Sequence, residues 1–147
     1  MKHFRAEKLK YLDLSLMPLE IQIQTTNDLR GSDAVICHLS GSLDTATAPE
    51  LERQLAPVLA QPIKDIVFDL AKLTFISSAG LRVFSNARKT LLERGGQASF
   101  VNLQPQIQEV FEIIRALSGV EIFMNTAKLD EYLAAKQRVH QRDQPPG

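Results

Sequence analysis

The sequence predicts one α/β domain on a mixed sheet, which starts with an antiparallel hairpin and continues with parallel strands. Residues 19–39 hold two strand-like segments on either side of a turn. From Lys64 onward, strand-like and helix-like segments alternate. Helices between strands imply crossover connections, which join parallel strands. With 147 residues, 44% of them hydrophobic, the chain can bury one substantial core.

The hairpin is predicted from the spacing of apolar residues. Apolar and polar residues alternate from Leu19 to Thr25, and an apolar segment follows at residues 34–39. Residues 27–33, between the two, are rich in turn-forming types. Cys37 is the only cysteine and lies in the second segment. We therefore expect a buried, unreactive thiol and no disulfide within the chain.

Gly41 to Thr47 leads from the hairpin into a helix. Asp44, Thr45 or Thr47 can cap its first turn. Pro57 removes a backbone donor from the same segment, so the helix either ends next to this residue or continues with a bend. The expected apolar face of this helix is Ala48, Leu51, Leu55, Val58 and Leu59.

The remainder of the chain alternates strands with helices. Gly95-Gly96 is expected to stop one helix, and Ser118-Gly119 another. Strands are expected at residues 66–70, 98–103 and 121–123, and helices at 80–94, 105–117 and from Asn125 or Thr126 onward. The expected core includes Ile66, Phe68, Leu81, Phe84, Leu91, Val101, Phe111 and Ile114.

The chain divides into an N-terminal extension at residues 1–17, a folded domain at 18–136 and a disordered tail at 137–147. The extension has apolar positions without a clear register, so a docking helix, a partner-binding arm and a disordered lead all remain open. The tail ends in Pro145-Pro146-Gly147 and offers little to bury.

Charge and hydropathy exclude several classes of function. Residues 11–135 hold 10 basic and 15 acidic side chains, whereas a nucleic-acid-binding domain should present a basic face. No apolar stretch approaches the roughly 20 residues that a membrane helix needs. The basic start lacks the apolar region of a signal peptide. We expect a cytoplasmic protein that binds neither nucleic acid nor a membrane.

The sequence also lacks the patterns of an enzyme. The three histidines are His3, His38 and His140, and no two of them have the spacing of a metal site on a helix. His38 is better explained as a strand residue with a hydrogen-bonded ring. The Gly-x-Ser-x-Gly elbow and the phosphate-binding loop of nucleotide hydrolases are absent. We expect no catalysis, no metal and no cofactor.

The segment from Phe75 to Arg82 carries the most information. It follows a buried strand and precedes a helical pattern, with Ser77 and Ser78 where the helix opens. Free N–H groups and the helix dipole meet there. A serine at this point can cap the helix, or it can carry a phosphate that the helix end tolerates. Local sequence alone favours the cap.

The chain resembles the STAS domain of bacterial anti-sigma factor antagonists over about residues 18–135. Gly41 to Thr47 is similar to the family's Gly-x-Leu-Asp-x-x-Thr segment, and Phe75 to Leu81 is similar to its Asp-Ser-Ser/Thr-Gly-Leu segment. Asp69-Leu70 and Gly95-Gly96 also fall where the family has equivalents. Four such matches in order at sensible spacing are fairly specific.

The resemblance implies a four- or five-stranded mixed sheet with about four helices, packed mainly on one side. It also implies binding to an anti-sigma serine kinase of the histidine-kinase-like ATPase type. The free antagonist sequesters this kinase and releases the sigma factor, and phosphorylation of the antagonist reverses the effect. By motif alignment the acceptor is Ser78. A PP2C-type phosphatase is the further partner that such a pathway allows.

Two positions depart from the family pattern. Ser77 stands where the family usually has Asp, and Ala79 stands where it often has a second Ser or Thr. A missing carboxylate alters how the acceptor hydroxyl is oriented or how the partner recognises the loop. Asp44 has two open interpretations, as a helix cap and as a residue lining the same face.

The resemblance assigns a partner-binding surface to the two motifs. The expected contact residues are Gly41, Asp44, Thr47, Ser77, Ser78, Gly80, Leu81 and Arg82.

The alternative function is that of a structural STAS subunit that is not phosphorylated, in a lipid-transport ATPase or a stress-sensing complex.

Overall fold

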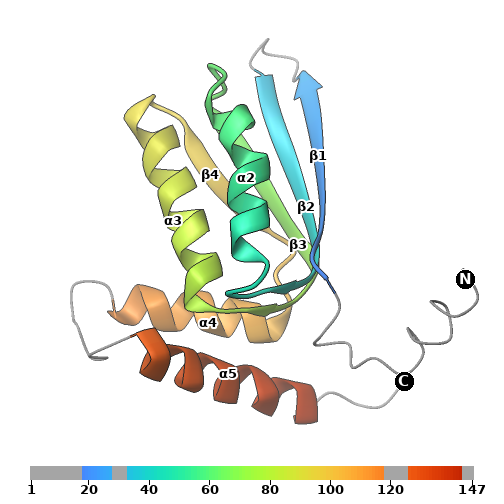
Figure 1. Cartoon of the computed structure of the whole chain (residues 1–147), viewed down its shortest axis with the longest axis vertical. Coiled ribbons are helices and arrows are strands. Elements are labelled where there is room, and N and C mark those ends of the chain that lie inside the picture. The colour runs from blue at the N-terminus through green and yellow to red at the C-terminus, as the bar shows by residue number, and fades with distance from the viewer. Residues whose placement is uncertain (1–17, 28–32, 118–125, 144–147) are drawn as a thin grey trace, which may run out of the picture.

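The computed structural model describes residues 18–27, 33–117 and 126–143, and within them four strands form one mixed sheet (Figure 1). The strand order is β1-β2-β3-β4. The first pair is antiparallel, and the other two pairs are parallel, as the sequence predicts. The strands are β1 (Glu20–Asn27), β2 (Asp33–Leu43), β3 (Asp65–Ile76) and β4 (Gln97–Val101).

Four helices accompany this sheet within the described residues. Two of them, α2 and α3, lie side by side over one face, and α4 and α5 cross together beneath the end where β2 and β3 finish (Figure 1). The α/β architecture predicted from the sequence is therefore confirmed. The helices are α2 (Ala48–Leu59), α3 (Ser78–Glu93), α4 (Pro105–Leu117) and α5 (Thr126–Asp143).

Most of the core lies between the sheet and α2 and α3, and buried residues of α4 and α5 extend it. Side chains alternate along the central strands, so that Val35, Cys37 and Leu39 of β2 are buried beneath the helices. Phe68 of β3 is completely buried, and its ring centroid lies 4.9 Å from that of Phe84 on α3. Phe100 and Phe111 extend this aromatic cluster from β4 and α4.

Two strands are longer than the sequence predicts. β3 continues six residues past Leu70, and β2 runs on through Gly41 to Leu43. The additional residues pair with each other across two register shifts. Gly41 has a φ of 104°, a conformation that glycine adopts without strain, and a Cβ there would lie 2.9 Å from the Pro18 carbonyl oxygen.

One expectation about a single residue needs correction. Val101 is 36% exposed rather than part of the core, because its neighbour Phe100 takes the inward position on β4. Of the two outcomes left open at Pro57, the helix continues, because α2 runs on to Leu59. Leu81, Phe111 and Ile114 pack against the core but are only partly buried.

The C-terminal end of the described chain is helical for longer than expected. Residues 137–143 continue α5, although the sequence led us to expect a disordered tail from residue 137. No proline or glycine interrupts this stretch before Pro145, and Leu133 and Gln137 are buried on the helix. The N-terminal extension, most of the predicted turn at 27–33 and the predicted strand at 121–123 lie outside the described residues.

The burial of Cys37 gives a direct test of the packing. The side chain is fully buried, and burial raises the pKa of its thiol to about 12. Near neutral pH this lowers the thiolate fraction about a thousandfold relative to an ordinary thiol. We expect a disulfide reagent such as Ellman's to label one thiol per chain promptly in denaturant and very slowly in the native state. Prompt labelling of the native protein would contradict the burial.

Candidate functional site

The predicted acceptor lies where β3 turns into α3. β3 ends at Ile76, Ser77 is extended with φ −107° and ψ 176°, and α3 begins at Ser78. Ser77 occupies the N-cap position, but its side chain makes no capping hydrogen bond. Its hydroxyl is buried and has no partner among the described residues, whereas Ser78 is half-buried. The serine cap favoured by the local sequence does not form.

Asp130 of α5 takes the place of that cap. One carboxylate oxygen accepts a hydrogen bond from the backbone N–H of Ser78 at 2.8 Å. The other accepts the Ser78 hydroxyl at 3.0 Å. A carboxylate is favoured at this position because the helix N-terminus carries a partial positive charge. The candidate acceptor hydroxyl is thus held by a residue 52 positions further along the chain.

Gln137 ties the same helix to the end of β3. Its side-chain oxygen accepts the backbone N–H of Ile76 at 2.9 Å, and its amide donates to the Ile76 carbonyl at 2.8 Å. The amide also donates to the carbonyl of Leu133, one turn earlier on α5. Gln137 is only 1% exposed, so these bonds satisfy a buried polar side chain.

The segment from Gly41 to Thr47 meets the acceptor segment at this end of the sheet. Leu43 pairs with Ile76, and the Leu43 carbonyl accepts the backbone N–H of Ser77 at 2.9 Å. Gly80 makes the contact close, because a Cβ there would lie 2.5 Å from Cγ of Leu43. The two motifs identified in the sequence are therefore neighbours in space.

Asp44 organises the loop before α2. Its Oδ1 accepts the backbone N–H groups of Ala46 and Thr47, at 2.9 and 3.1 Å. The Thr47 hydroxyl in turn donates to the Ser42 carbonyl at 2.8 Å and accepts the Asp44 N–H at 2.9 Å. The N-cap residue of α2 is Thr47, without a side-chain capping bond. Asp44 thus stabilises the turn that precedes the helix, and its carboxylate stays half-buried.

Burial separates the predicted contact residues into three groups. Ser77 and Gly80 are buried, so they shape the turn without offering a side chain to a partner. Arg82 is exposed. The half-buried members are Gly41, Asp44, Thr47, Ser78 and Leu81.

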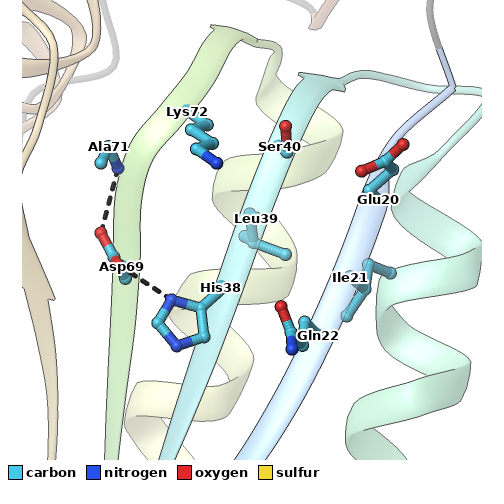
Figure 2. Close-up of a pocket in the computed structure, with 9 residues that line it drawn as sticks. All are labelled: Glu20, Ile21, Gln22, His38, Leu39, Ser40, Asp69, Ala71 and Lys72. Carbon is cyan, nitrogen blue, oxygen red and sulfur yellow. Dashed lines mark hydrogen bonds and ion pairs between the residues drawn. The ribbon is translucent and has the colours of Figure 1, made fainter.

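A second polar cluster lies on the face of the sheet that α2 and α3 leave open (Figure 2). His38 Nδ1 lies 2.9 Å from Asp69 Oδ2, which confirms a hydrogen-bonded ring. The pKa of Asp69 is lowered, chiefly by the hydrogen bond from the Asn102 amide and also by those from the Ala71 N–H and His38. His38, Asp69 and Ala71 border a hollow of about 360 Å³. Among the described residues, no group of three or more His, Cys, Asp or Glu side chains could hold a metal ion.

Sequence reasoning missed Asp130 and Gln137. Leu133 follows Asp130 by three positions and Gln137 follows it by seven, a spacing that places all three residues on one face of α5. That spacing was visible in the sequence, but it also fits an ordinary amphipathic helix.

Within the part of the chain that is described, no helix is long and apolar enough to cross a membrane.

Comparison with known proteins finds one matching family model, the STAS domain, over residues 20–129. A putative anti-sigma factor antagonist of Bordetella bronchiseptica, BtrV, is 39% identical over 84 residues, which cover 57% of this chain and 72% of that protein. The anti-sigma-B factor antagonist of Staphylococcus aureus is 27% identical over 95 residues, or 65% of this chain and 85% of the relative.

Solved structures share the fold. The unphosphorylated anti-sigma factor antagonist SpoIIAA superposes with a TM-score of 0.53 at 19% identity, over 69% of this chain and 100% of that one. An anti-sigma factor antagonist from Mycobacterium paratuberculosis gives a TM-score of 0.55 at 22% identity, over 80% and 95% of the two chains.

Proposed function

The chain belongs to the STAS domain family, and from this premise we propose that it is an anti-sigma factor antagonist controlled by phosphorylation of Ser78. Its partner is an anti-sigma serine kinase with a histidine-kinase-like ATPase fold. The unphosphorylated protein binds this kinase and frees the sigma factor, and the kinase reverses the binding by modifying Ser78. The protein acts in the cytoplasm as a regulatory binding module rather than as an enzyme.

The half-buried hydroxyl of Ser78 at the start of α3 carries this proposal. The N-terminus of a helix favours an anion, so it can receive a phosphate without unfolding. Ser77 is a poor competitor, because it is only 6% exposed and its hydroxyl oxygen is buried. The exposed Arg82 lies one turn further along α3, where a partner contacting Ser78 can also reach it.

Intact-mass spectrometry tests the proposal. The protein is first incubated with ATP and with an ATPase-type serine kinase that a neighbouring gene encodes. We expect one added phosphoryl group on the unaltered protein and on Ser77→Ala, and none on Ser78→Ala. Labelling of Ser77 with Ser78 spared would overturn the acceptor assignment. No labelling by any kinase encoded nearby would favour the structural-subunit alternative.

Charge changes beside the acceptor distinguish a contact residue from a structural one. Arg82→Glu should weaken kinase binding at least about tenfold while the melting temperature stays nearly constant, because the side chain is exposed. Asp44→Ala should weaken kinase binding and, in contrast to Arg82→Glu, should lower the melting temperature. It removes the acceptor of two backbone hydrogen bonds, from Ala46 and Thr47, worth about 0.5–1.5 kcal/mol each. Calorimetric titration and thermal denaturation of both variants provide the measurements. A lowered melting temperature with unchanged binding for Arg82→Glu would remove this residue from the contact.

A further inference from the structure

The contacts of Asp130 connect α5 to the acceptor itself. Both of its carboxylate oxygens are used by Ser78, one by the backbone N–H and one by the hydroxyl. We propose that Asp130 makes the start of α5 a detector of the state of Ser78: the helix docks while Ser78 carries a hydroxyl and is released when it carries a phosphate. This inference rests on the proposed function, which supplies the phosphorylation.

The chemistry of the modification removes what Asp130 binds. In the transfer, Ser78 Oγ forms a bond to the γ-phosphorus of ATP, the bond from that phosphorus to ADP breaks, and the hydroxyl proton leaves to solvent. The product has no hydrogen on Oγ, so the 3.0 Å bond to Asp130 is lost. The added group carries about −1.5 to −2 charges and three acceptor oxygens. It therefore repels the carboxylate and competes with it for the Ser78 N–H.

The acceptor side of this contact is firmly held. Ser77 donates its N–H to the Leu43 carbonyl at 2.9 Å, and its own carbonyl accepts the Leu81 N–H at 3.0 Å. Gly80 packs directly against the Leu43 side chain. The end of β3 and the first turn of α3 are thus fixed to β2. The repulsion between the phosphate and Asp130 should therefore displace α5 rather than the acceptor segment.

Gln137 limits how far α5 responds. Its two hydrogen bonds to Ile76 involve neither Ser78 nor a charge, so a phosphate leaves them intact. Asp130 lies about two turns before Gln137 on the same face. The segment around Asp130 should therefore loosen while the segment around Gln137 stays docked. Release would uncover apolar surface beside Ser78, including part of the fully buried Leu133.

Hydrogen exchange of the full chain tests the detector, with phosphoserine built in at position 78 during translation. We expect amides of residues 127–133 to exchange at least about tenfold faster than in the unmodified chain, and those near Gln137 to change much less. Asp130→Asn in the phosphorylated chain should restore slow exchange, because the amide accepts the Ser78 N–H and donates to the phosphate. Equal exchange of α5 with and without the phosphate would overturn the proposal.

Phosphoserine at the exposed Ser85 is the matched control, since it adds the same charge two turns further along α3. It should leave the exchange of α5 unchanged, and an equal acceleration would show a general charge effect instead of a detector. No kinase is needed in this experiment. Failure of the kinase assay would remove the proposed function without affecting this result, and failure here would leave the kinase assay standing.

Discussion

Replacing Phe68 with alanine should lower the free energy of unfolding by about 3–5 kcal/mol. The side chain is completely buried on a central strand, and its ring centroid lies 4.9 Å from that of Phe84 and 5.2 Å from that of Phe100. Truncation removes both ring contacts and leaves a cavity that the paired strands on either side cannot close. Chemical denaturation measures the loss, which is a large part of a typical stability of about 5–15 kcal/mol.

Two variants of neighbouring residues calibrate this result. Phe111→Ala should lower the stability less than Phe68→Ala, because Phe111 lies at the edge of the same cluster and is only partly buried. Val101→Ala should change it by less than about 1 kcal/mol, because the side chain is 36% exposed. A loss below about 1 kcal/mol for Phe68→Ala would contradict the assignment of the aromatic cluster to the core.

The fold could be predicted because most of its elements have local causes. Helical spacing located α4, and glycine at residues 95 and 96 located the end of α3. The extension of β3 beyond Leu70 had no such cause, since it depends on pairing with β2 across two register shifts. The inward face of β4 was misjudged for a similar reason, because Phe100 and Val101 are both apolar and only packing decides between them.

The site was predictable only in part. The two motifs come together because each includes the end of one of two paired strands, a relation that topology implies. Asp130 and Gln137 contact residues 52 and 61 positions away, so their roles depend on how α5 packs beneath the sheet. The family pattern also drew attention to the carboxylate missing at Ser77. The structure supplies a carboxylate to Ser78 from a different helix.

Phosphorylation of Ser78 should weaken binding of the anti-sigma kinase at least about a hundredfold, which requires about 2.7 kcal/mol. A partner that fits a hydroxyl must desolvate a dianion without a matching donor, and the penalty for this readily exceeds that figure. The helix dipole favours the phosphate by only about 0.3–1 kcal/mol, and Asp130 opposes it. The domain should stay folded, because most of the core lies between the sheet and α2 and α3.

Substitutions at Ser78 should reproduce the two states of this switch. Ser78→Ala keeps the backbone N–H that Asp130 accepts, so it should bind the kinase normally and escape inactivation by ATP. Ser78→Asp places a second carboxylate beside Asp130 and should bind weakly. Ser77→Ala is the control, since it alters a buried hydroxyl and should be inactivated like the unaltered protein. Tight binding by the phosphorylated protein, measured by calorimetry, would contradict control through Ser78.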